Sequence, residues 1–321
     1  MFNTLTLPSK MKEAGSPEDG EPEVKFVVLV PFRDEPSQNR RAHYETFLSY
    51  MPDVLNRLHG AGRWAIMVGE QTVDGRRFSR ARVLNAVALI ASAMFPGATL
   101  IFHDIDLLPD ETRVALYGRP IPPPYHITLL NCDPEYAGCD MYIGGICAIH
   151  ASTFLHSTVN GFPNGFIGWG GEDDALRNLV FRFAGRKKDV IYVPAGGSVR
   201  NLETDPAFVK PEHIRAKNND GCKMPREDRH ALKDSCARHG NDDGVAELVF
   251  GVAGITDLGQ DRCYMRVVRL ELFVELPPSW SCAMSKTRCR PYYSNPAVTP
   301  GIWEYPSGTK VSRHDVVWTA P

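Results

Sequence analysis

The sequence lacks the features that mark membrane-spanning or nucleic-acid-binding proteins. It contains no apolar run of about 18 residues, so it predicts no transmembrane helix. Its formal net charge is −2, which gives no reason to expect a nucleic acid or an anionic membrane surface as a partner. No Asn-x-Ser/Thr sequon occurs, which weakly disfavours a glycosylated, lumenal history.

Cysteine is scarce in the first part of the chain, and none of the eight cysteines lies before residue 132. Because no two of them form a Cys-x-x-Cys pair, a structural zinc site is not expected. Residues 1–25 lack the apolar core of a signal peptide and are predicted to form a disordered leader. The chain as a whole, with 43% hydrophobic and 23% charged residues, has the composition of a soluble globular protein.

The chemistry is concentrated between residues 160 and 178, where a run of glycines ends as three carboxylates begin. Glycine allows tight bends, and acids in a first helical turn favour the positive end of the helix dipole. A plain glycine loop before a helix explains the acids one by one, but not a tryptophan set between glycines. An aromatic face beside a carboxylate that can accept a hydroxyl proton suits a sugar site. These residues are Gly168, Trp169, Gly170, Gly171, Glu172, Asp173 and Asp174.

Short apolar runs alternate with helical segments, which predicts an α/β fold with a buried sheet. The expected strands are residues 26–30, 64–68, 99–103, 126–130, 141–149 and 190–193. The expected helices cover residues 44–55, 78–94 and 176–183. Residues 206–240 are polar and are predicted to be loop-rich.

Charged residues follow two of the predicted strands at the end where open α/β sheets bind ligands. Arg33 follows the first strand, although a solvated loop arginine is an equally acceptable interpretation. Asp104 and Asp106 follow the third strand, and carboxylates at i and i+2 can approach one divalent cation. Such pairs are also common in turns. Tyr142 suits a core position, and Gly145 inside a strand suggests close approach of a ligand.

Two segments of the central stretch resemble a known signature. Asn-Gly-Phe-Pro-Asn at 160–164 and Gly-Trp-Gly-Gly-Glu-Asp-Asp at 168–174 are similar to the motif of the β-1,4-galactosyltransferases. The resemblance covers about residues 26–276 and implies a GT-A fold, with a Rossmann-like, mostly parallel sheet and helices on both faces. It also implies closing strands at residues 243–245, 248–252 and 264–267. It divides the chain into a nucleotide-binding half at 26–110 and a donor and acceptor half at 111–276. Residues 277–321 form an extension, expected to be an irregular cover.

The resemblance implies an inverting transferase that moves galactose from UDP-galactose to a hydroxyl of a glycan or glycoconjugate, with manganese (Mn2+). It implies Asp173 as the catalytic base and Glu172 as the residue that orients the acceptor. The implied nucleotide contacts are Pro31, Phe32, Arg33, Phe78, Arg80 and Ile105. The implied sugar contacts are Asp104, Tyr142, Gly145, Trp169, Gly170, Gly171 and Asp174, and the implied metal ligands are Asp106 and Asn201.

The sequence departs from the family at the metal site. Asn201 stands where the family has a histidine ligand, and the preceding methionine ligand falls near Ser198. Glu203, Asp205 or His103 are alternatives for the third ligand, and the sequence does not choose among them. Two further alternatives remain, a UDP-N-acetylgalactosamine transferase and a non-catalytic sugar-binding relative. Animal members of the family are Golgi proteins, whereas this sequence shows no signal peptide or membrane anchor. A soluble, cytoplasmic localisation is therefore a further alternative.

Overall fold

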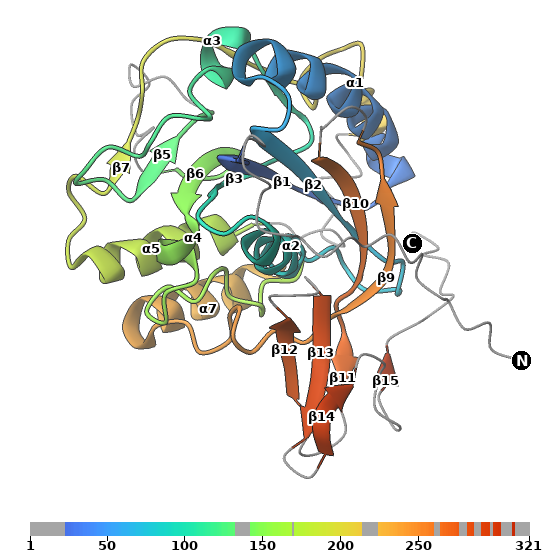
Figure 1. Cartoon of the computed structure of the whole chain (residues 1–321), viewed down its shortest axis with the longest axis vertical. Coiled ribbons are helices and arrows are strands. Elements are labelled where there is room, and N and C mark those ends of the chain that lie inside the picture. Colours follow the sequence, from blue (N-terminus) through green and yellow to red (C-terminus); the bar gives the residue numbers. More distant parts are fainter. Residues whose placement is uncertain are drawn as a thin grey trace, which may run out of the picture.

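Strand β1 (Phe26–Phe32) lies in the middle of an eight-stranded sheet in the computed structural model (Figure 1). The strand order is β7-β5-β6-β3-β1-β2-β10-β9. The structure describes residues 23–131, 142–168, 170–213, 224–259, 264–275, 281–285, 290–295, 298–302 and 310–311. The other strands of this sheet are β2 (Trp64–Gln71), β3 (Thr99–His103), β5 (Ile127–Leu129), β6 (Ile146–His150), β7 (Ile191–Tyr192), β9 (Gly251–Asp257) and β10 (Tyr264–Glu271).

The predicted parallel core is confirmed, because β3, β1, β2 and β10 pair in parallel. Strand β6 runs antiparallel to both of its neighbours, β3 and β5, and β9 is an antiparallel edge strand. The helices are α1 (Arg40–His59), α2 (Arg80–Met94), α3 (Glu111–Val114), α4 (Ala151–Phe154), α5 (Glu172–Ala184) and α7 (Arg226–His239). A 3-10 turn, η1 (Pro36–Gln38), precedes α1.

The side chains of β1 pack into two hydrophobic cores, because successive residues of a strand point to opposite faces of the sheet. Val27 and Leu29 pack with α2 and α5 on one face, whereas Val28 and Val30 pack with α1 on the other. Helix α1 buries Phe47, Met51 and Leu55 at helical spacing, as predicted. The sheet is therefore covered by helices on both sides (Figure 1).

Several sequence-based predictions were wrong. Residues 206–240 contain the helix α7, whose pattern is weak because Cys236 is its only buried residue. This polar helix packs against α5 rather than against the sheet (Figure 1). Residues 243–245 and 248–250 are not in strands, since β9 begins at Gly251. Residues 142–145 lie before β6, which begins at Ile146, and not in the strand predicted at 141–149.

The extension after residue 277 forms strands rather than an irregular cover in its described parts. β12 (Ser281–Ser285), β13 (Arg290–Asn295) and β14 (Val298–Ile302) make an antiparallel sheet. A second small sheet pairs β11 (Val274–Glu275) with β15 (Lys310–Val311). Tyr293 is buried and its hydroxyl donates to the Phe250 carbonyl at 3.0 Å, which fixes the extension to the body. The division of the chain at residues 25, 110 and 276 stays a prediction.

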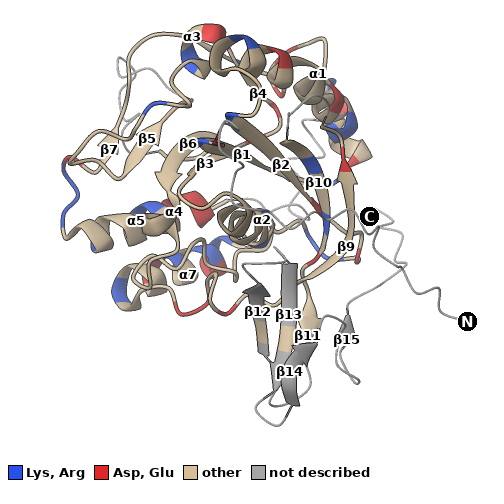
Figure 2. Cartoon of the chain, viewed as in Figure 1, with Lys and Arg blue, Asp and Glu red and all other residues tan. Residues whose placement is uncertain are grey.

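The surface carries charges of both signs. Figure 2 shows Lys or Arg and Asp or Glu side by side on α1, α3 and α7. Within the described residues, no helix combines the length and the apolar character needed to cross a membrane.

Candidate active site

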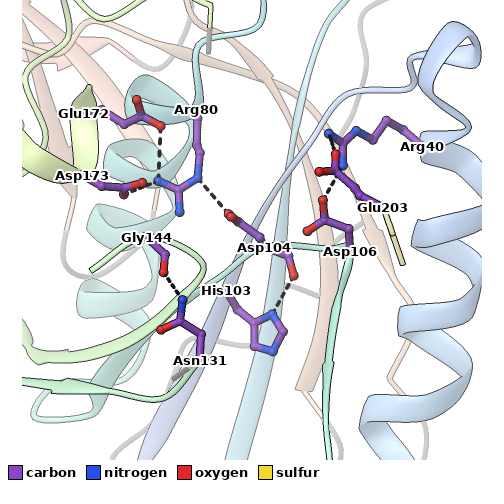
Figure 3. A network of polar contacts seen from close by, with 10 residues as sticks. All are labelled: Arg40, Arg80, His103, Asp104, Asp106, Asn131, Gly144, Glu172, Asp173 and Glu203. Carbon is purple, nitrogen blue, oxygen red and sulfur yellow. Dashed lines mark hydrogen bonds and ion pairs between the residues drawn. The ribbon is translucent and has the colours of Figure 1, made fainter. Parts of the chain in front are cut away.

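The residues predicted to carry the chemistry meet at the carboxyl ends of the parallel strands. The segment from Asp104 to Asp106 follows β3 directly, and Arg80 is the first residue of α2, the helix after β2. The first turn of α5 brings Glu172 and Asp173 to the same place (Figure 3). Two arginine–carboxylate clusters result, one on each side of residues 104–106.

The first cluster is built around Arg80, whose guanidinium lies among three carboxylates. Its Nε donates to Asp104 Oδ1 at 2.8 Å, and its Nη1 donates to Asp173 Oδ1 at 2.7 Å. The same Nη1 lies 3.6 Å from Glu172 Oε1. Since the Arg80 side chain is only 12% exposed, these charges are largely withdrawn from water. The cluster therefore links the Asp-x-Asp segment to the start of α5 through one cation.

Burial governs the protonation of this cluster. Desolvation and the neighbouring Asp173 raise the pKa of Glu172 to about 7, although Arg80 opposes the shift. Desolvation also raises the pKa of Asp104 to about 6, against the pull of Arg80. Desolvation lowers the pKa of Arg80, but the neighbouring carboxylates outweigh it and raise this pKa, so the guanidinium stays charged. Titratable groups with shifted pKa values in one place are typical of functional sites.

Gly144 brings Tyr142 and Asp173 together. A Cβ at this glycine would lie 2.3 Å from Tyr142 Oη and 2.7 Å from Asp173 Oδ2. Only a residue without a side chain allows both groups this close. The Tyr142 side chain is one of the few large apolar groups in the described chain that is exposed, at 56%, so a ligand can reach it. Burial of its hydroxyl and the charge of Asp173 raise the pKa of Tyr142.

Gly145 connects the segment before β6 to the Asp-x-Asp segment. Its φ is +87°, and a Cβ there would lie 2.6 Å from Asn131 Nδ2. Its carbonyl accepts from the Asp104 N–H at 2.8 Å, and the Asn131 amide donates to the Gly144 carbonyl. The backbone at residues 144–145 thus positions Asp104. The close contacts around it explain why glycine occupies both positions.

The glycine-rich loop adopts the backbone that its glycines predict. Gly168, Gly170 and Gly171 have φ values of +91°, +102° and +101°, which side chains rarely adopt. Arg229 of α7 lies against this loop, since a Cβ at Gly171 would meet its Cγ at 2.6 Å. Trp169 lies outside the described residues, so its predicted sugar contact stays a prediction.

The asparagines of the motif at 160–164 act as anchors. Asn85 of α2 donates to the Phe162 carbonyl at 2.7 Å and to Asn164 Oδ1 at 3.0 Å. Asn164 in turn donates to the Gly244 carbonyl at 2.6 Å. Asn160 donates to Glu247 Oε2 at 2.7 Å. These buried amides fasten the loop before α5 to α2 and to residues 241–247, which fixes where the carboxylates of α5 begin.

The predicted nucleotide contacts are only partly accessible. The Arg33 guanidinium lies 5.8 Å from the Phe78 ring centre and pairs with Glu35 at 2.9 Å. Phe32, in contrast, is buried and stacks on Tyr44 with ring centres 4.8 Å apart. Pro31 lies within β1, and Ile105 is buried. Arg33 and Phe78 are therefore within reach of a ligand, and the sixth predicted contact, Arg80, is held by the first carboxylate cluster.

The second cluster surrounds Asp106. Its Oδ2 accepts from Arg40 Nη1 at 2.8 Å, and Arg40 Nη2 donates to Glu203 Oε1 at 2.5 Å (Figure 3). Asn201 comes close through the pairing of β4 (Leu107–Pro109) with β8 (Val199–Asn201), where Leu107 opposes Asn201. Its side-chain oxygen accepts from the Glu203 N–H at 2.9 Å.

The other two candidates for a third metal ligand, Asp205 and His103, are engaged by other groups. Asp205 pairs with Arg200, and the Ser198 hydroxyl bonds to Asp110 Oδ2 at 2.9 Å. The His103 ring packs on Phe47, and burial lowers its pKa to about 4. In the described part of the chain, no three His, Cys, Asp or Glu residues are grouped as a metal shell. The carboxylate oxygens of Asp106 and Glu203 nevertheless converge on one cation, Arg40. Carboxylate oxygens are also the ligands that hard divalent ions prefer.

Sequence analysis missed Arg40 and Arg229. Arg40 opens a helix soon after β1, and the Asn39 before it has a φ of +57°. The dipole favours anions at a helix start, so an arginine there is unexpected. This was the available signal that Arg40 pairs with carboxylates of other segments. Arg229 lies on the polar helix that was predicted as a loop.

Comparisons with known proteins agree with this architecture. Residues 5–118 match the family model "N-terminal region of glycosyl transferase group 7", and residues 124–190 match "N-terminal domain of galactosyltransferase". Human β-1,4-galactosyltransferase 1 is 34% identical over 179 residues, which are 54% of this chain and 41% of that protein. Mouse β-1,4-galactosyltransferase 5 is 34% identical over 203 residues, 63% of this chain and 46% of that protein. The chain thus spans less than half of these relatives.

Among solved structures, the catalytic fold of Drosophila β-1,4-galactosyltransferase 7 superposes on this chain. A mutant of that protein in complex with manganese, UDP-Gal and xylobiose gives a TM-score of 0.57 at 22% identity. The match covers 83% of this chain and 99% of that one. The predicted GT-A fold is confirmed by this likeness.

Proposed function

Since the chain belongs to the β-1,4-galactosyltransferase family, we propose that it transfers galactose from UDP-galactose to a sugar hydroxyl with inversion. The observation that supports this most is the position of Asp173. One of its oxygens, Oδ1, is held by Arg80 at 2.7 Å. The other, Oδ2, lies on the side of Gly144 and Tyr142, where an acceptor can approach.

The proposed reaction is a single displacement. The acceptor hydroxyl oxygen forms a bond to C1 of galactose, and the bond from C1 to the diphosphate oxygen breaks with its electron pair leaving on UDP. The hydroxyl proton passes to Asp173, which acts as the general base. Glu172 is 4% exposed and is proposed to orient the acceptor. The hydrogen bond to Arg80 keeps the Asp173 carboxylate in place during the proton transfer.

The leaving diphosphate needs positive charge, which Arg80 and Arg33 can provide. Manganese is the proposed divalent cation, with Asp106 and Glu203 as the carboxylates that would hold it and Asn201 next to them. When bound, it would add positive charge beside the leaving group. The loop from Gly168 to Gly171 is proposed to cover the bound sugars and exclude water.

A donor panel tests this function. Purified protein is incubated with UDP-galactose, UDP-N-acetylgalactosamine and UDP-glucose, with xylose- and N-acetylglucosamine-terminated acceptors, and with or without manganese, and UDP release is measured. We expect the fastest acceptor-dependent release from UDP-galactose. Preference for UDP-N-acetylgalactosamine would favour the alternative transferase. UDP binding without release from any donor would favour a non-catalytic relative.

Tyr142 is expected to set the choice of donor. Its exposed side chain lies beside Asp173 over Gly144, and we propose that it crowds C2 of the donor sugar. Tyr142→Leu should therefore raise the rate with UDP-N-acetylgalactosamine relative to UDP-galactose, by about tenfold, because one pocket contact is worth about 1–3 kcal/mol. The ratio of the two kcat/KM values is the measurement. The matched control is Tyr264→Leu, which changes another exposed tyrosine on β10, and an unchanged ratio in Tyr142→Leu would exclude this role.

A further inference from the structure

Arg40 lies where the proposed function would bring a divalent cation. Its guanidinium bridges Asp106, which follows β3, and Glu203, which follows β8 (Figure 3). The distances are 2.8 Å to Asp106 Oδ2 and 2.5 Å to Glu203 Oε1. The three side chains are 20%, 11% and 18% exposed, so the contact is shielded from water without being closed to it.

The structure holds this arginine in place from several directions. Gln38 Oε1 accepts from Arg40 Nε at 3.4 Å and from Nη2 at 3.3 Å. Asn39 donates to the Phe208 carbonyl at 2.8 Å, which ties the start of α1 to the segment that carries Glu203. The Leu202 N–H donates to the Asp106 carbonyl at 2.7 Å, which ties that segment to Asp106. The two carboxylates therefore face the guanidinium as parts of a fixed frame.

A metal ion and the guanidinium would compete for these oxygens. Hard divalent cations bind carboxylate oxygens at about 2.0–2.6 Å, and an ion bridging both carboxylates would need the position of the guanidinium. A diphosphate, however, offers Arg40 other partners, because a guanidinium binds phosphate oxygens through two parallel hydrogen bonds. Moving Arg40 to a diphosphate would leave two carboxylates facing one another, which a cation would stabilise.

We propose that Asp106 and Glu203 are the carboxylate ligands of the divalent cation and that Arg40 is their exchangeable counter-ion. It occupies their oxygens in the free protein and moves to the donor diphosphate when UDP binds. The inference rests on the proposed function for the identity of the donor. Metal and nucleotide then strengthen each other's binding, because each removes the obstacle to the other. Glu203 takes the role that the resemblance gave to Asn201.

Manganese binding to the free protein tests this exchange without a turnover assay. Calorimetry with manganese chloride compares the wild type, Arg40→Met and the control Arg41→Met. Arg41 is the next arginine of α1 and pairs with Asp34 at 2.9 Å rather than with Asp106. We expect Arg40→Met to bind manganese about five-fold tighter or more than the wild type, within the usual range of coupling between sites. Arg41→Met should behave as the wild type. Unchanged or weaker binding in Arg40→Met would overturn the proposal.

Two more arms complete the test. Glu203→Gln should weaken manganese binding in the presence of UDP, and this variant decides the question if circular dichroism shows that Arg40→Met does not fold. Unchanged affinity in Glu203→Gln would overturn the role of Glu203. Adding UDP should tighten manganese binding more in the wild type than in Arg40→Met. If UDP binds none of the proteins, the proposed function fails, whereas the measurements with manganese alone still decide the competition with Arg40.

Discussion

Replacing Asp173 with asparagine is expected to lower kcat by about 10²–10⁴, while UDP binding stays close to that of the wild type. The amide keeps the size of the carboxylate, and its oxygen can still accept the hydrogen bond from Arg80 Nη1, which is 2.7 Å long. It cannot accept the proton of the acceptor hydroxyl. The variant therefore separates proton transfer from the binding of the nucleotide.

Initial rates with UDP-galactose and calorimetry with UDP check this result. Asp257→Asn is the control, because it makes the same chemical change at a residue of β9 whose side chain is 59% exposed. It should turn over normally. Near-normal turnover of Asp173→Asn would remove Asp173 from the mechanism, and loss of UDP binding would mean that the residue is structural.

Replacing Arg80 with methionine is expected to lower the free energy of unfolding by about 3–5 kcal/mol, the usual cost of leaving a buried charge without its partner. Arg80 is the cation within 3.6 Å of the carboxylates of Asp104, Asp173 and Glu172. Methionine has a similar length but no charge. Urea denaturation measures the difference, with Arg57→Met as the control. Arg57 pairs with Glu111 in water, with both side chains more than half exposed, and should change the free energy by about 1 kcal/mol or less.

The loss in Arg80→Met should grow with pH. Desolvation and Asp173 already raise the pKa of Glu172 to about 7, and Arg80 lowers it from a still higher value. Without Arg80, the folded variant holds protons that the unfolded chain has released, so its stability falls as the pH rises. The difference from the wild type should therefore be larger at pH 8 than at pH 5. A loss that is equal at both values, or as small as that of Arg57→Met, would mean that Arg80 is not the cation that stabilises these carboxylates.

Sequence alone was sufficient where a pattern is local. The apolar runs before Arg33 and Asp104 predicted β1 and β3, because a strand buried on both faces needs consecutive apolar residues. The glycines at 168, 170 and 171 predicted a bend at the start of α5, and all three have positive φ. Such features depend on neighbours in the chain.

The parts that could not be predicted depend on partners far away in the sequence. Arg40 and Asp106 are 66 positions apart, and Arg40 and Glu203 are 163 apart, so no spacing rule connects them. α7 was missed because it needs little apolar surface of its own when α5 covers it. The choice of Glu203 over Asp205 needed the directions of two side chains only two positions apart, since Glu203 pairs with Arg40 and Asp205 with Arg200.

The order of strands in the main sheet also determines when that sheet can be completed during translation. β2 begins at Trp64, but its partner on the outer side, β10, begins at Tyr264. At about 5–20 residues per second, the ribosome delivers that partner roughly 10–40 seconds after β2. In this interval the apolar strand β2 has an open edge, the kind of surface to which other chains add as strands. During this interval the nascent chain therefore depends on α1 and α2, which are synthesised early, to shield the two faces of β2 until β10 pairs with its edge.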